Sequence, residues 1–192
     1  EVPTITTSTG RTWMAHDLLV DPTNMNSGSA LFQWGRPRDG HENPNSPTTQ
    51  AQALTSQPAH PSFITRDNWT SASLGELAAA WQPDTATNPC PNGFEVPTIA
   101  DWKAEIAAHA DYASLITAMN IETDSYGHRN VYTGKPLSDI VRYWAIDQPA
   151  LSISLVIRGS SFDYHPDWPA IHPHTNLWEI GRGFRVRCIQ SL

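Results

Sequence analysis

Helical periodicity in this sequence is confined to the middle of the chain, and strand patterns lie on both sides of it. Trp102 and Ile106 lie four residues apart in an amphipathic run, which is the spacing of one helix face. Thr98 precedes this run, and Asp101 stands three residues after Thr98, as in a capping box at a helix start. The pattern predicts a helix from Thr98 to about His109.

A second helical stretch follows directly. Residues Tyr112–Met119 place Leu115, Ile116 and Met119 on one face. We therefore expect two helices in the middle of the chain, and Leu74–Trp81 is a candidate for another short one.

Strand patterns dominate both ends of the chain. Thr12–Val20 and Leu31–Trp34 are strand-like and are separated by a turn-rich segment. Apolar residues alternate with serines over residues 151–157, and Phe184, Val186 and Cys188 alternate with two arginines. This last alternation points Cys188 inward. The order of the elements predicts an α+β class with short twisted antiparallel strands.

Residues 36–71 are rich in Pro, Asn, Ser, Thr and His and show little periodicity. An irregular stretch of this length inside a compact domain is usually functional or lies over the surface. We expect extensive ordered loops within one domain that covers residues 1–192.

The composition excludes two classes of partner. The net charge is −7 without a basic cluster, whereas a nucleic-acid partner requires basic side chains to neutralise phosphates. No run approaches the roughly 18 apolar residues that cross a bilayer, so we expect no membrane span. The chain begins at Glu1 rather than Met, and we expect a mature or trimmed chain.

Cys90 and Cys188 are the two cysteines of the chain. They are too few and too distant for a CxxC metal or redox motif. Two interpretations remain open at this point, a pair of buried thiols or a disulfide. A disulfide that closes a loop of ~100 residues contributes up to ~4.7 kcal/mol in the entropy model and implies an oxidising compartment.

The segment Ser160–Gly183 shows no strand pattern but is rich in aromatic residues and histidine. Its composition is typical of a binding loop. His165, His172 and His174 offer metal ligands, but no pair of histidines is spaced along a helix. Solvent-facing or aromatic-packed histidines are the favoured interpretation, so we expect no metal.

Enzymatic interpretations find little support. A serine hydrolase requires a G-x-S-x-G nucleophile elbow, which Gly159-Ser160-Ser161 resembles only superficially. Asp163 and Asp167 are compatible with glycoside chemistry, but nothing fixes their separation. We expect neither an enzyme nor a cofactor.

Four segments resemble one family. Residues 88–102 read NPCPNGFEVPTIADW, residues 10–18 read GRTWMAHDL, residues 31–41 read LFQWGRPRDGH, and residues 183–189 read GFRVRCI. In this order they resemble the signature of the Fibrobacter succinogenes major paralogous domain family over residues 10–189. Asp17 stands where the family usually has Asn. The family is similar to the C-type lectin-like fold and occurs in secreted, lipid-anchored or surface-exposed bacterial and phage proteins.

The resemblance implies that Cys90 pairs with Cys188 and that the C-terminal half supplies the ligand face. Residues 158–162 and 183–186 also resemble the frame of lectin-like proteins that diversity-generating retroelements vary. Comparing the coding repeat with an adenine-rich template repeat tests this resemblance. The expected ligand-binding residues are Ile146, Asp147, Phe162, Asp163, Tyr164, His165, Asp167, Trp168, His172, His174, Asn176 and Trp178.

We therefore expect an extracellular, cell-surface or virion-associated receptor or adhesin domain whose partner is a protein or a glycan. The calcium motifs of carbohydrate-binding lectins are missing from the sequence, which disfavours calcium-dependent sugar binding. The alternative is a structural or assembly module of a pilus, a tail fibre or a cell-surface complex. Oligomerisation is left open.

Overall fold

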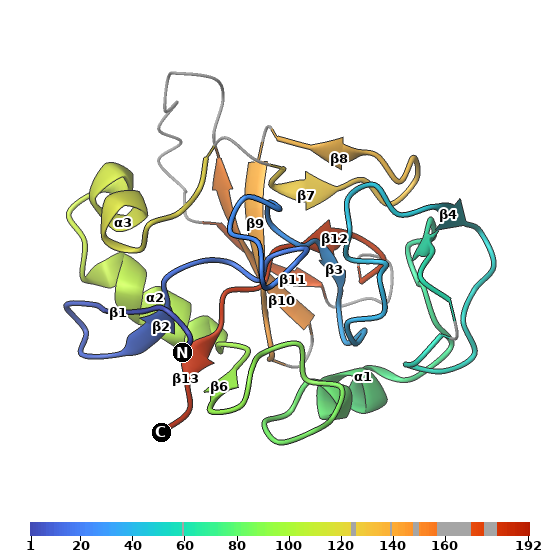
Figure 1. The fold of residues 1–192 in the computed structure, drawn as a ribbon, viewed down its shortest axis with the longest axis horizontal. Coiled ribbons are helices and arrows are strands. Elements are labelled where there is room, and N and C mark those ends of the chain that lie inside the picture. The colour runs from blue at the N-terminus through green and yellow to red at the C-terminus, as the bar shows by residue number, and fades with distance from the viewer. Residues whose placement is uncertain (59, 124–125, 139, 148–149, 157–169, 175–179) are drawn as a thin grey trace.

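The computed structural model describes residues 1–58, 60–123, 126–138, 140–147, 150–156, 170–174 and 180–192. Within these ranges, three helices combine with many short and mostly antiparallel strands, so the predicted α+β class is confirmed. Figure 1 shows α2 and α3 on one side of the central strands and the irregular segments around β4 on the other.

Each helix begins with a capping box. The helices are α1 (Leu74–Ala80), α2 (Ile99–Ala107) and α3 (Tyr112–Ala118), and their N-caps are Ser73, Thr98 and Asp111. In each box the cap side chain accepts from the third residue of the helix, whose side chain binds back to the cap. Both expected helices are confirmed. The candidate helix over Leu74–Trp81 is confirmed as α1, which buries Leu77 in the core, so the described residues hold three helices rather than the expected two. Such short helices depend on tertiary packing.

The strands form four sheets in the described part of the chain. In pairing order they are β1 (Thr4–Thr6), β2 (Thr12–Met14), β13 (Ile189–Gln190) and β6 (Phe94–Glu95); β11 (Ala170–His174), β10 (Ala150–Val156) and β9 (Ile140–Ala145); β3 (Phe32–Gln33), β12 (Gly183–Phe184), β7 (His128–Arg129) and β8 (Pro136–Leu137); and the parallel pair β4 (Thr48–Thr49) and β5 (Phe63–Ile64).

Two expected strands are shorter than predicted. The strand predicted over Thr12–Val20 ends at Met14, because the chain then leaves its partner strand and the Leu18 N–H donates to Val186 O at 2.9 Å. The strand predicted over Leu31–Trp34 is reduced to β3. Gly35 follows with a positive φ of 76°, and a Cβ there would lie 2.5 Å from the Leu77 Cβ. Only glycine therefore fits this turn against α1.

Tryptophans form much of the core and also bind backbone carbonyls. Six of the eight are almost completely buried. The indole N–H of Trp34 donates to Ala145 O at 2.9 Å, and that of Trp144 donates to Phe32 O at 2.7 Å. Trp69 and Trp81 make similar bonds to backbone carbonyls. Buried indoles need such partners, and here the accepting carbonyls belong to the strands β9 and β3 and to the turn that follows β3.

The disulfide between Cys90 and Cys188 is confirmed, with the two Cα atoms 5.9 Å apart. Cys188 is fully buried, as the alternation in its segment predicted. The bond joins the segment that leads into α2 to the last strand region. No helix in the described ranges is both long and apolar enough to cross a membrane.

Candidate functional site

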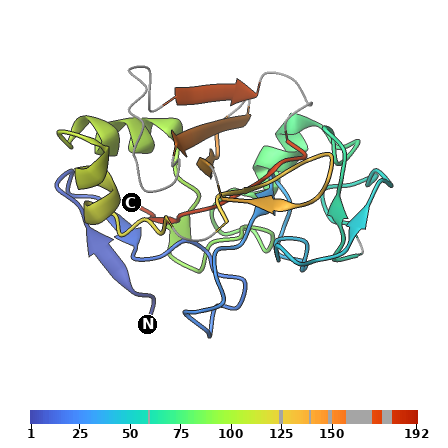
Figure 2. The same ribbon diagram turned by 90° about the horizontal axis from the view of Figure 1, so that it is seen from above.

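The three-stranded sheet of β9, β10 and β11 carries the predicted binding segments. β10 pairs with β9 from Leu151 opposite Ala145 to Val156 opposite Ile140. On its other side β10 pairs with β11, from residue 150 opposite residue 174 to residue 154 opposite residue 170. Figure 2 shows β11 on the outer side of β10. The sheet thus has one end at Ala145 and the opposite end at Val156.

The predicted site residues are attached to both ends of this sheet. Residues 146–149 and 175–179 continue from the end at Ala145, whereas residues 157–169 join Val156 to Ala170 at the other end. A strand of seven residues such as β10 is about 20 Å long. The expected residues that lie outside the described ones are Phe162, Asp163, Tyr164, His165, Asp167, Trp168, Asn176 and Trp178.

The expectation of an irregular loop throughout Ser160–Gly183 is wrong at residues 170–174, which form β11. Backbone hydrogen bonds to β10 define this strand, and no pattern of side chains in residues 170–174 predicts them. Pro173 is compatible with this strand because β11 is the edge of its sheet in the described part of the chain. His172 and His174 therefore occupy strand positions, opposite Ser152 and Ala150 respectively.

Ile146 and Asp147 connect the sheet to the start of α2. The Asp147 carboxylate accepts the Ile99 N–H at 2.6 Å, and the Ile146 N–H donates to Pro97 O at 3.0 Å. Ile146 is half-buried against the main core. The carboxylate thus satisfies one of the free N–H groups of the helix N-terminus. A contact of these two residues with a ligand stays a prediction.

Strand β9 is fixed to the C-terminal segment. The Trp144 N–H donates to Arg185 O at 3.0 Å, and the Arg185 N–H donates to Arg142 O at 2.9 Å. β9 therefore runs alongside residues that lie three positions before the disulfide at Cys188.

A buried charge cluster beneath β9 completes this anchor. Asp17 accepts from Arg185 Nη1 at 3.0 Å, from Arg187 Nε at 2.7 Å and from the Tyr143 hydroxyl at 3.0 Å. Burial alone would raise the pKa of Asp17, but the two guanidinium groups and the hydrogen bonds outweigh it and hold that pKa below its ordinary value. Asp17 is therefore ionised, and its charge balances buried arginine.

The same arginines hold irregular backbone. Arg185 donates to Glu122 O at 2.7 Å and to Tyr126 O at 2.9 Å, and Arg187 donates to Met119 O. Arg129 does the same for the region 36–71, where it binds Asn43 O at 2.9 Å and the hydroxyl and carbonyl of Ser46, each at 2.7 Å. Buried loop carbonyls need donors, and guanidinium groups supply several each.

One group of metal-type donors converges in the described residues, namely Asp39, His41 and Glu42. All three are already engaged. His41 Nδ1 lies 2.7 Å from Asp39 Oδ1, and His41 Nε2 accepts the Gln33 N–H at 3.0 Å. Glu42 accepts the Gly40 N–H at 2.8 Å. This cluster is therefore a structural one that fixes the turn after β3.

His41 predicts a dependence of stability on pH. Burial, together with the charges of Arg36 and Arg129, lowers the pKa of His41 to about 4 despite the nearby Asp39. An unfolded histidine protonates near pH 6.5, so its contribution is full above that pH and is lost as the pH falls toward 4. The free energy of unfolding should fall by about 2 kcal/mol from this group between about pH 7 and about pH 5.

Urea unfolding at a series of pH values measures this effect. A His41→Gln variant should show a flatter dependence over the same range, since it removes the titrating group. An identical slope in both proteins would assign the pH dependence to other groups.

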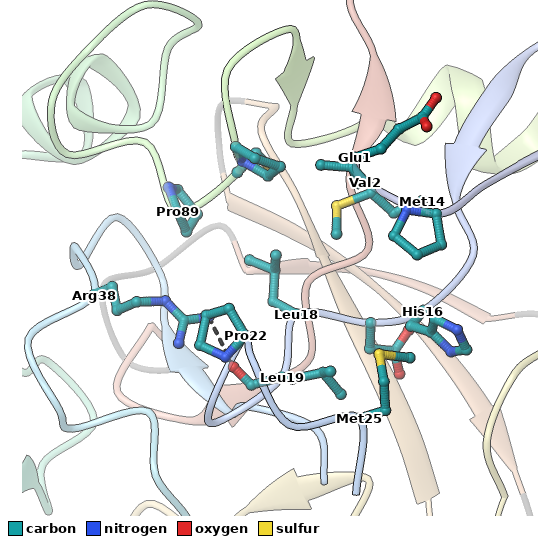
Figure 3. A pocket seen from close by; sticks show the side chains of 14 residues that line it. Glu1, Val2, Met14, His16, Leu18, Leu19, Pro22, Met25, Arg38 and Pro89 are labelled. Atoms are coloured by element: carbon teal, nitrogen blue, oxygen red, sulfur yellow. Dashed lines mark hydrogen bonds between the residues drawn. The ribbon is translucent and has the colours of Figure 1, made fainter. Parts of the chain in front are cut away.

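A pocket of about 280 Å³ lies between the N-terminal residues, the segment after β2 and the prolines beside Cys90. Figure 3 shows Met14, Leu18, Leu19 and Met25 around it. Arg38 at its edge donates to Leu19 O at 2.9 Å. The lining is mainly apolar. Sequence reasoning missed this pocket, because its residues follow no periodicity and come from separate segments between Glu1 and Pro91.

Comparisons of the chain with protein-family models, with curated proteins and with solved structures found no match.

Proposed function

We propose that this protein is a recognition domain of C-type lectin-like architecture that binds a protein or glycan ligand through residues 146–147 and 160–178. One observation carries the proposal. The segments are attached to a sheet that is anchored by buried ion pairs and, through the C-terminal segment, by the disulfide. Residues 160–178 are themselves rich in aromatic residues and histidine.

A recognition domain needs a rigid scaffold beneath variable contact residues. β9 is joined to the C-terminal segment by backbone bonds, that segment is joined to Asp17 by two arginines, and Cys188 ties it to Cys90. Substitution of side chains in the attached segments would leave all of these contacts intact. Tyr164 and Trp168 would then supply apolar contact area, and neighbouring Asp and His side chains would orient the ligand.

The disulfide also supports a place outside the reducing cytosol, since such bonds persist mainly in oxidising compartments. We propose a secreted, surface-displayed or virion-associated protein, consistent with the family that the sequence resembles.

A binding screen against bacterial surface glycans and surface proteins tests the function. A variant with Tyr164, His165, Trp168 and His172 all changed to Ala should bind the identified ligand at least about 100-fold more weakly, because aromatic anchors dominate binding energies. Leu54→Ala is the matched control, since Leu54 is 85% exposed in the region 36–71. It should bind as the unchanged protein does.

Circular dichroism and thermal unfolding establish that both variants remain folded. Loss of binding in Leu54→Ala alone would move the site to residues 36–71 and contradict the proposal. If the screen identifies no ligand and the protein forms a stable oligomer in solution, the assembly module would be favoured instead.

A further inference from the structure

A second hollow, of about 400 Å³, lies where the turn after β2 meets the segment after β3 and the start of β7. Its described lining consists mainly of amide and hydroxyl side chains beside one aromatic ring. The side chains that the argument uses are Asn26, Asn43, Asn45, Ser138 and Tyr126. None of the described lining residues carries a charge, although the chain as a whole has a net charge of −7.

The backbone around this hollow is fixed by its own hydrogen bonds. The Asp21 N–H donates to Ser27 Oγ at 2.9 Å, and Ser27 Oγ donates back to Asp21 O at 3.1 Å. On the other wall, Asn43 Oδ1 accepts the Asn45 N–H at 2.9 Å. The side-chain amides of Asn26 and Asn45 make no hydrogen bond to the described part of the protein. They remain available to a ligand.

These groups match the chemistry of a sugar. An amide side chain offers two N–H donors and a carbonyl acceptor. A sugar hydroxyl both donates and accepts hydrogen bonds, so it can pair with either group of the amide. Tyr126 adds an aromatic surface that is 44% exposed, on which the C–H face of a pyranose can pack. Its backbone is held in place because its carbonyl accepts from Arg185 Nε at 2.9 Å. The volume lies within the range of small-molecule sites.

We infer that this hollow binds a neutral mono- or disaccharide unit, at a site separate from the segments 146–147 and 160–178. An anionic sugar is disfavoured, because no described lining residue offers a cation. The inference rests on side chains that the proposed function does not use.

Saturation-transfer NMR and titration of the full chain with glucose, galactose, mannose, N-acetylglucosamine and lactose test the inference. At least one sugar should bind with a dissociation constant of the order of 1 mM, the strength that a few neutral hydrogen bonds provide. Tyr126→Ala and Asn45→Ala should each weaken it at least about tenfold, and Tyr126→Phe, which keeps the ring, should bind more strongly than Tyr126→Ala. Tyr132→Ala removes another exposed tyrosine outside the hollow and should leave the affinity unchanged.

Failure of this site is distinguishable from failure of the proposed function. The variant with Ala at positions 164, 165, 168 and 172 should keep its sugar affinity. Loss of sugar binding in that variant alone would overturn the hollow as the site while supporting the loop segments. Binding of none of the sugars, or an affinity in Asn45→Ala and Tyr126→Ala equal to that of the unchanged protein, would also overturn the inference.

Discussion

Replacing Asp17 with asparagine should lower the free energy of unfolding by about 3–5 kcal/mol, the usual cost of leaving a buried charge without its partner. Asp17 is 4% exposed, and it is the carboxylate that both Arg185 and Arg187 contact. Asparagine keeps the volume but removes the negative charge that balances the two guanidinium groups. The Tyr143 hydroxyl keeps an acceptor in the variant, so the loss is one of charge rather than of packing.

Urea unfolding followed by tryptophan fluorescence measures this change. Asp67→Asn is the control, because the hydrogen bond of the Asp67 carboxylate within the described residues is an exposed one from the Tyr132 hydroxyl, at 3.3 Å. Its effect should stay within about 0.5 kcal/mol. If Asp17→Asn were as stable as the control, the buried cluster would not anchor the sheet.

Removing the disulfide should cost a similar amount. In the entropy model, a bond that closes a loop of ~100 residues contributes about 4–5 kcal/mol, and Cys90 and Cys188 are 98 positions apart. The double variant Cys90→Ala with Cys188→Ala should therefore unfold at a much lower urea concentration than the oxidised protein.

The reduced unchanged protein is the matched comparison for this variant. Its stability should fall close to that of the double variant, since both lack the covalent link. Equal stability of the oxidised protein and the double variant would mean that the bond adds nothing beyond the packing around it.

The elements that the sequence predicts well are those with local signals. The capping box of Thr98 and Asp101 lies at the start of the helix that it predicts. The period-two alternation over residues 151–157 predicts β10 within one residue at each end. The inward position of Cys188 follows from the same kind of pattern. Each signal concerns neighbours along the chain, which is why a single sequence reveals it.

The buried arginines could not be predicted in this way. Arginine is mostly a surface residue, yet Arg36 and Arg129 are buried, and their partners are backbone carbonyls tens of positions away. Every residue has a backbone carbonyl, so the sequence does not show which carbonyls a buried arginine binds. The strand β11 was not predicted for a similar reason, because it is defined by its pairing with β10.

Placement of the predicted binding residues depends on the same non-local pairing. The sequence predicts that residues 146–147 and 160–178 form one ligand face, whereas the register of β10 attaches residues 146–147 and 175–178 to one end of the sheet and residues 160–169 to the other. The positions of residues along the sequence do not show to which end of a sheet a segment is attached.

Hydrogen–deuterium exchange of the chain, with and without a saturating ligand from the screen, tests the central proposal most directly. The proposal predicts slower exchange in peptides that cover residues 157–179, with little change in β9 or in the segment 183–188, which is already held by buried bonds. Unchanged exchange throughout residues 157–179, with protection elsewhere on the bound protein, would contradict it.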